Sequence, residues 1–139
     1  MLNVDLNKLE LNEFIAKNHP GQRCKATFPL FAAHGSQDSA TVYFELDTGE
    51  ELGSHTDSAE EVLLIIEGSI EATVGEEKGV AEKGNLLLVP KMVPHNFKNI
   101  GNTKAKVLGF FGGANNIVAT FDNVWLPTES NMVDTSLLV

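Results

Sequence analysis

The sequence has few of the residues on which several common classes of protein depend. Cys24 is its only cysteine, so the chain cannot form a disulfide within itself. Arg23 is its only arginine, which argues against an enzyme that grips phosphate through bidentate arginine contacts. The apolar runs are far shorter than the roughly 20 residues that span a bilayer, and no basic segment followed by an apolar run resembles a secretory signal. We therefore expect a cytoplasmic protein that does not bind membranes.

Positive charge is scarce as well. The chain has ten lysine and arginine residues and nineteen aspartate and glutamate residues, which gives a formal net charge of −9. An acidic surface repels phosphate backbones, so nucleic acid is excluded as a partner. The apolar content of 42% and the length of 139 residues are ordinary for one globular domain. We therefore predict a single domain over residues 1–139.

Short strand-like runs separated by turn residues follow one another from about residue 26. These runs cover residues 26–33, 40–46, 61–67, 69–74, 86–89, 93–99 and 104–111. Such spacing is typical of a β-sandwich or a β-barrel, so the expected fold class is all-β. The runs 61–67 and 86–89 are apolar on both faces, which indicates that the chain ends or a second subunit cover their outer side. We therefore predict a homodimer.

The two ends of the chain lack this strand pattern. Near the start, Leu11, Phe14 and Ile15 fall at helical spacing and predict a short N-terminal helix or two turns. Near the end, an apolar patch around Trp125 predicts an extended C-terminal arm that docks on the rest of the protein. The predicted domain therefore divides into an N-terminal arm, a barrel and a C-terminal arm, at residues 1–25, about 26–112 and 113–139.

Four side chains between residues 55 and 95 have the chemistry of metal ligands. His55 and Asp57 are two residues apart, so on a strand both point to the same face. Glu61 begins the next apolar run, and His95 follows a second strand and a turn that contains proline. Imidazole nitrogens and carboxylate oxygens bind Fe, Mn, Ni and Zn. Two or three of these groups converging in a barrel would form a mononuclear site with open positions.

The spacing of these residues resembles the two sequence motifs of the cupin superfamily. The first motif, G-x5-H-x-H-x3,4-E-x6-G, matches at Gly49, His55, Glu61 and Gly68. The second motif, G-x5-P-x-G-x2-H-x3-N, matches at Gly84, Pro90, His95 and Asn99. The resemblance implies a small single-domain cupin, which is a double-stranded β-helix or jelly-roll barrel. It also implies one divalent metal ion per chain (Fe, Mn, Ni or Zn) inside the barrel.

Two positions depart from the motifs. Asp57 stands in place of the second histidine, so it either joins the ligand set or only neighbours it. His55, Glu61 and His95 complete the set that the resemblance implies, and only Glu61 among the carboxylates occupies a ligand position of the motif. Met92 stands in place of a glycine, where a left-handed backbone costs about 1–2 kcal/mol. Either the turn before His95 therefore differs from that of the family, or Met92 leans into the pocket.

Alternation along the strands predicts the wall of the site. Phe97 and Asn99 share a face with the histidine of the second motif, and Leu63 shares a face with the glutamate of the first. Together with Met92, these side chains predict a mostly apolar pocket for a small-molecule ligand or substrate.

Three functions are compatible with this pattern. Two histidines and a carboxylate with open positions form the facial triad of Fe(II) oxygenases, and small cupins of this kind resemble quercetin-dioxygenase-like proteins. That resemblance implies a dioxygenase in which Glu61 is both a metal ligand and the catalytic general base. The same ligands serve a non-redox isomerase, lyase or decarboxylase. A barrel that binds a metabolite without turnover is the third alternative, since the fold alone does not decide function.

Replacing either predicted histidine ligand is expected to remove most of the metal. His55→Ala and His95→Ala should each lower the content from about one ion per chain to a small fraction, because each removes one of the few ligands that share the ion. Elemental analysis of the purified proteins measures this content. Full metal content in both variants would contradict the assignment.

Overall fold

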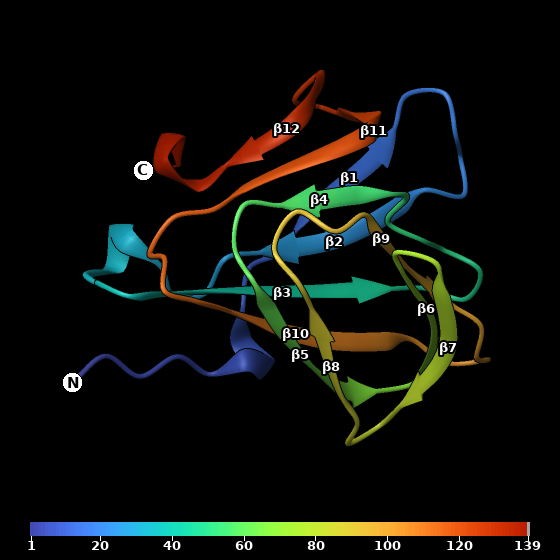
Figure 1. The fold of residues 1–139 in the computed structure, drawn as a ribbon, viewed down its shortest axis with the longest axis horizontal. Coiled ribbons are helices and arrows are strands. Elements are labelled where there is room, and N and C mark those ends of the chain that lie inside the picture. Colours follow the sequence, from blue (N-terminus) through green and yellow to red (C-terminus); the bar gives the residue numbers. More distant parts are fainter. Residues whose placement is uncertain (139) are drawn as a thin grey trace.

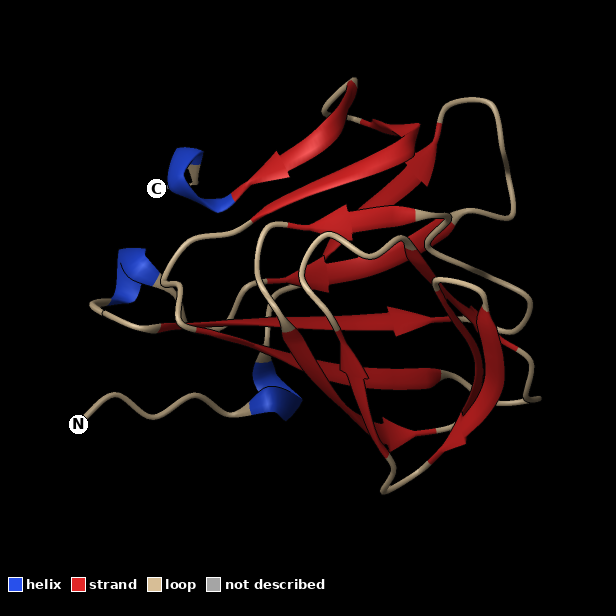
Figure 2. Ribbon diagram, in the orientation of Figure 1, coloured by secondary structure: helices blue, strands red, loops and turns tan. Residues whose placement is uncertain are grey.

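Antiparallel strands account for most of the chain, which the computed structural model describes over residues 1–138 (Figure 1, Figure 2). The strands are β1 (Asn12–Ala16), β2 (Arg23–Thr27), β3 (Ser39–Leu46), β4 (His55–Asp57), β5 (Glu61–Glu67), β6 (Ser69–Val74), β7 (Glu77–Glu82), β8 (Leu86–Val89), β9 (His95–Asn99), β10 (Ala105–Gly112), β11 (Val118–Leu126) and β12 (Ser130–Asp134). Short 3-10 helices are η1 (Leu6–Lys8), η2 (Ala32–His34) and η3 (Thr135–Leu137). None of these helices has the length and apolar character needed to cross a bilayer. The predicted all-β fold class is confirmed.

The strands form one curled, nearly closed sheet. Its hydrogen-bonded order is β7-β6-β9-β4-β11-β1-β2-β3-β10-β5-β8, with β12 paired to β11. Strand β4 lies between β9 and β11, and β5 lies between β10 and β8, so segments far apart in the sequence surround one interior (Figure 1). This order allows the inward side chains of β4, β5 and β9 to meet.

Alternation along each strand sends one set of side chains into the barrel. On β5, Leu63 and Ile65 are fully buried, whereas the residues between them are partly exposed. Phe97 of β9 and Phe44 of β3 stack in the same core cluster, with ring centroids 6.1 Å apart. Burial of each such side chain contributes roughly 1.5–3 kcal/mol to the free energy of unfolding. The core therefore supports the strands that carry the predicted ligands.

The outer face of β10, β5 and β8 is apolar and partly exposed. The strand registers align two outward rows of side chains, which are Phe110, Val62 and Leu88, and Leu108, Leu64 and Leu86. Leu86 and Leu88 are 66% and 58% exposed. The described residues leave this part of the doubly apolar face open, and the homodimer stays a prediction.

The helix predicted from Leu11, Phe14 and Ile15 is wrong. A single turn, η1, forms before them, and the Asp5 side chain caps it by accepting a hydrogen bond from the Asn7 N–H at 2.9 Å. The stretch predicted as helix forms β1 instead, which pairs with β2 on one side and with β11 on the other. Pairing on both edges satisfies the backbone and lets one face enter the barrel, so the sheet outweighs the helical spacing of three apolar residues.

The extended C-terminal arm is also corrected by the structure. Residues 118–126 form β11, the longest strand, and residues 130–134 form β12, so this segment is a β-hairpin within the sheet. The sheet therefore extends beyond the predicted barrel boundaries of 26–112 at both ends. Val139, the last residue of the predicted arm, lies outside the described residues.

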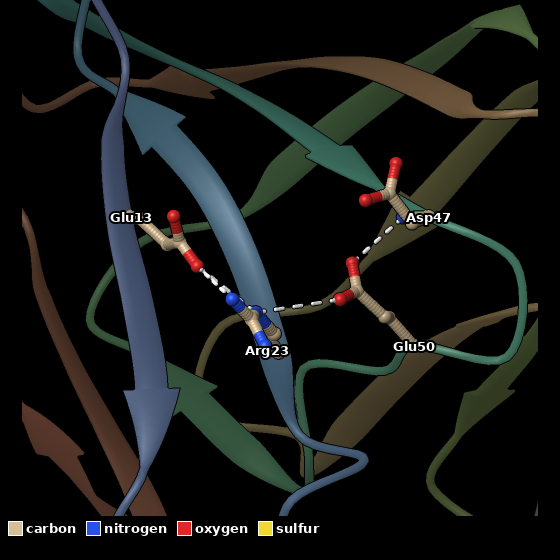
Figure 3. A network of polar contacts seen from close by, with 4 residues as sticks. All are labelled: Glu13, Arg23, Asp47 and Glu50. Atoms are coloured by element: carbon tan, nitrogen blue, oxygen red, sulfur yellow. Dashed lines mark hydrogen bonds and ion pairs between the residues drawn. The ribbon is translucent and has the colours of Figure 1, made fainter.

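The single arginine is held on the outer surface of the barrel. Its guanidinium donates hydrogen bonds to Glu13 and lies 3.7 Å from one carboxylate oxygen of Glu50, whose other oxygen accepts from the Asp47 N–H (Figure 3). The side chains of Arg23 and Glu13 are 45% and 43% exposed, so solvent screens their ion pair and it contributes little to stability. Arg23 faces outward because Cys24, the next residue on β2, is buried in the core.

Met92, which stands at the glycine position of the second motif, has a left-handed backbone. Its φ is 62°, in the region that favours glycine. Its N–H donates to the backbone carbonyl of Asp57 at 3.0 Å, which ties the turn to β4. Its side chain is 56% exposed and points away from the barrel interior, so Met92 does not lean into the pocket.

Met92→Gly is expected to raise the free energy of unfolding by up to about 1 kcal/mol, because glycine adopts a positive φ without the steric cost. Lys91→Gly is the matched control. The neighbouring backbone is not left-handed, so glycine there should lower stability by about 0.5–1 kcal/mol through added freedom in the unfolded chain. Chemical denaturation measures both changes, and equal destabilisation by the two substitutions would contradict the expectation.

Candidate metal centre

The four predicted ligands all lie inside the barrel. His55 and Asp57 come from β4, Glu61 is the first residue of β5, and His95 is the first residue of β9. Their exposed fractions are 6%, 4%, 3% and 2%, respectively. Ionisable groups buried together cost free energy unless their charges are compensated. The barrel therefore concentrates polar chemistry at one place in an otherwise apolar interior.

Three of the four residues form a tight cluster. One ligand atom from each of His55, Asp57 and His95 lies within 4.8 Å of the other two. The antiparallel register of β4 and β9 places His55 directly opposite His95, with ring centroids 4.0 Å apart. Asp57 joins them because alternation returns its side chain to the same face of β4 two residues after His55.

The same kind of backbone contact orients both imidazoles. Nδ1 of His55 lies 2.9 Å from the carbonyl oxygen of Gly53, and Nδ1 of His95 lies 2.8 Å from that of Val93. Since a carbonyl oxygen only accepts, each Nδ1 carries the proton and donates it. In the neutral ring this leaves Nε2 as the acceptor, which is the form in which imidazole binds a metal.

Nε2 of His95 and Oδ2 of Asp57 face each other across 3.0 Å. Both atoms are buried, and neither has a hydrogen-bond partner among the described residues. With the imidazole proton on Nδ1, two acceptors meet without a donor, which is unfavourable unless a cation binds both. Two atoms bonded to one ion at about 2.1 Å lie about 3.0 Å apart when their bonds meet at a right angle. The donors and their spacing therefore fit a divalent metal ion.

Glu61 is the fourth group of the cluster. Its Oε1 lies 3.8 Å from Nε2 of His95, close enough for both atoms to bind one ion, because two bonds of about 2.1 Å span up to about 4.2 Å. Burial, and next the charge of Asp57, raises the pKa of Glu61 well above its ordinary value. Burial, aided by His95, also lowers the pKa of His55 to about 4. Both shifts reflect an interior that disfavours uncompensated charge.

The two carboxylates lie at different distances from His95, 3.0 Å for Asp57 and 3.8 Å for Glu61. The motif ranked Glu61 above Asp57 as a ligand, but Asp57 belongs to the tight cluster with the histidines and Glu61 stands beside it. We therefore interpret His55, Asp57 and His95 as the central ligand set. Glu61 is the adjacent group that can bind the same ion or hold a proton.

An apolar cavity of about 90 Å³ lies beside the cluster. Six phenylalanines and Trp125 line it together with His55, Asp57 and Glu61. Phe121 stacks on the His55 ring with centroids 4.5 Å apart and 16° between the planes, and Trp125 packs edge-on against Phe121 at 5.3 Å. The cluster therefore faces a space with room for a small molecule.

One of the four side chains predicted to line the pocket does so. Phe97 lies in the cavity wall. Leu63 is fully buried in the core, the side chain of Asn99 donates to two backbone carbonyls, and Met92 points to solvent. Leu63, Met92 and Asn99 are not among the residues that line this cavity. Sharing a strand face with a ligand does not bring a residue to the same depth in the barrel.

Much of the cavity wall comes from the chain ends and was missed by the sequence reasoning. Phe14 lies on β1, and Phe121 and Trp125 lie on β11, both of which were predicted as parts of arms. The signal that could have found them is the alternation of Ala119 and Phe121 with polar residues, which is typical of a strand with one buried face.

Comparisons with known proteins agree with the observed fold. The family model described as "Cupin domain" matches residues 42–111, which is half of the chain. An uncharacterized protein of Methanocaldococcus jannaschii is 37% identical over 51 residues, which cover 37% of this chain and 41% of the relative. The chain thus spans about two fifths of the length of this curated relative.

Two solved structures share the architecture at low sequence identity. The polyketide cyclase RemF from Streptomyces resistomycificus has a TM-score of 0.66 at 16% identity, covering 81% of this chain and 79% of that one. The Lactobacillus farciminis oxalate decarboxylase, in a formate complex, has a TM-score of 0.67 at 19% identity, covering 79% of this chain and 32% of that one. At such identities the similarity shows the fold alone.

Gly109 leaves open the space that the Glu61 carboxylate occupies. It lies on β10, beside β5, in register with Leu63. A Cβ at this position would overlap Oε2 of Glu61 and come within 2.9 Å of Cγ1 of Val42. The φ of Gly109 is not positive, so crowding rather than backbone strain opposes a side chain there.

Gly109→Ala is expected to lower the free energy of unfolding by about 1–3 kcal/mol through overpacking against Glu61. Gly112→Ala on the same strand is the matched control, because a Cβ there meets no atom within 4 Å. Glu61→Asp shortens the crowded side chain, so a double-mutant cycle should recover part of the loss in Gly109→Ala. Chemical denaturation measures the cycle. Equal effects of the two alanine substitutions would contradict this account.

Proposed function

The chain belongs to the cupin domain family, and we propose that it is a metalloenzyme of dioxygenase type that acts on a small molecule. The observation that carries the proposal is the buried pair of unpartnered acceptors, Nε2 of His95 and Oδ2 of Asp57. In a purely structural barrel, apolar side chains of similar volume would serve such a position at least as well. The presence of the pair beside a cavity therefore supports a bound ion.

We assign one divalent ion to His55, Asp57 and His95, with Glu61 beside it. Two imidazoles and one carboxylate are the donor set typical of Fe(II) in oxygenases. An ion held there supplies Lewis acidity and, when it is Fe(II), reactivity toward dioxygen.

The side chains around the ion bind and orient the substrate and hold its proton. Glu61 lies in the cavity wall and 3.8 Å from His95, so its carboxylate is placed to take a proton from a substrate hydroxyl. The aromatic wall excludes water from the reacting groups. Phe121, stacked on His55, limits rotation of that imidazole.

A non-redox reaction at the same site is the second candidate. The presence of Glu61 in addition to three clustered ligands favours it, because a second carboxylate can move a proton between substrate atoms without a change in oxidation state. Metal identity and oxygen uptake separate the two candidates. Iron with oxygen uptake supports a dioxygenase, whereas zinc or nickel without uptake supports an isomerase or lyase. Saturable binding without turnover would indicate a metabolite-binding barrel.

Glu61→Gln is expected to keep most of the metal and to lose at least about a hundredfold in turnover, since the amide keeps the size but accepts no proton. Asp57→Asn is expected to lose most of the metal. Glu60→Gln, at the exposed neighbouring residue, is the control and should change neither property. Elemental analysis gives the metal content, and oxygen uptake in a screen of small apolar compounds gives the turnover.

Two results would count against these assignments. A metal-free Glu61→Gln beside a fully loaded Asp57→Asn would restore the motif's ranking of the carboxylates. Wild-type protein that binds none of Fe(II), Mn, Ni or Zn would refute the metalloenzyme proposal itself.

A further inference from the structure

The cavity wall beside the metal centre contains few polar side-chain atoms. Apart from His55, Asp57 and Glu61, the only heteroatoms of its side chains are the indole nitrogen of Trp125 and the sulfur of Cys24. Burial raises the pKa of Cys24 to about 12, so this thiol stays protonated and uncharged. The wall therefore favours a ligand with an apolar surface.

The wall also lacks a positive charge. No lysine or arginine among residues 1–138 lines this cavity. Arg23 is occupied on the outer surface by Glu13 and Glu50 (Figure 3). Lys25 lies two residues along the same strand, so alternation places it on the same side as Arg23. A carboxylate or phosphate on the substrate would find no cationic side chain in the wall.

The centre itself already brings two acidic groups to the cavity. Asp57 and Glu61 both line it and are buried in an otherwise apolar interior. An anionic substrate would add a negative charge beside them with no cationic side chain to compensate it, which is costly. A neutral hydroxyl compound adds no such charge.

We infer that the substrate is an uncharged, largely apolar molecule of about one ring in size that carries one ionisable hydroxyl group. The ring fits the aromatic cavity of about 90 Å³, and the hydroxyl faces Glu61 and the ion. Its O–H bond breaks, the proton goes to the Glu61 carboxylate, and the electron pair stays on the substrate oxygen. This inference rests on the proposed function, because it places the hydroxyl against Glu61 and the proposed ion.

Part of the wall that favours a neutral, apolar ligand lies outside the segment that the family model matches. The four ligand residues lie inside the matched segment 42–111, whereas Phe14, Phe121 and Trp125 lie outside it. Oxalate, which gives the similar oxalate decarboxylase its name, is a dianion. The wall of this cavity has no cationic side chain to bind a dianion. Similarity of fold therefore does not imply that this chain binds oxalate.

Binding of three probes of similar size tests the inference. Phenol is neutral with an ionisable hydroxyl, benzyl alcohol is neutral with a hydroxyl that does not ionise, and benzoate is an anion. Calorimetry is performed on metal-loaded and on chelator-treated protein, and the fluorescence of Trp125, the only tryptophan, reports occupation of the cavity. Both neutral probes should bind both forms, and benzoate should bind at least about tenfold more weakly than phenol. Metal loading should strengthen phenol binding more than benzyl alcohol binding.

A pair of neighbouring substitutions on β2 locates the binding. Ala26 lines the cavity, and Thr27 faces the other side of the strand. Ala26→Leu fills the space and should weaken phenol binding at least about tenfold, whereas Thr27→Leu should leave it within about twofold.

Two outcomes would overturn the inference. One is benzoate binding as tight as phenol binding in the metal-loaded protein, and the other is no binding of any probe to the wild type. The result for metal is separate. If the protein binds phenol but takes up no metal, the proposed function is refuted and the preference for neutral rings stands. If the protein binds metal but prefers benzoate, the preference for neutral rings is refuted and the metal site stands.

Discussion

The close approach of two buried acceptors, on Asp57 and His95, is the constraint on which the rest of the site depends. At 3.0 Å, with no donor between them, these atoms oppose the packing that surrounds them. The backbone holds them in place, because β4 is bonded between β9 and β11, and the Met92 N–H bonds the carbonyl of Asp57. Binding of an ion removes the conflict, so metal affinity and folding stability support each other.

The barrel assigns chemistry and recognition to different parts of the chain. The ligands come from β4, β5 and β9, which lie within the segment shared with the family, and much of the cavity wall comes from β1, β2 and β11. Aromatic rings on the outer segments reach the centre because those strands close the sheet beside β4. The wall can therefore change while the ligand geometry stays the same, which is how one fold comes to host unrelated activities.

Local sequence patterns predicted the central strands and the cluster but not the ends or the depth of the site. The runs 61–67, 69–74 and 86–89 form strands with those bounds, since buried apolar runs between turns need little long-range information. Strands β1 and β11 gain their structure from pairing with neighbouring strands on both edges, which no local pattern reports. Alternation predicted the strand face on which Leu63 and Asn99 lie, but it did not predict their position along the barrel relative to the cavity. The relation of Asp57 and Glu61 to the two histidines also depends on distances between strands, which no local pattern contains.

The position of β4 in the sheet also affects the order in which the protein assembles during synthesis. This three-residue strand carries His55 and Asp57, pairs with β11 through three residue pairs, and meets β9 through one. Strand β11 leaves the ribosome long after β4. Until then, His55 and Asp57 lie on a strand that is largely unpaired while the middle of the chain folds. The centre is complete only when β11 docks. An ion bound at this centre would therefore meet an almost finished barrel rather than the growing chain, and the shape of that barrel would take part in its selection.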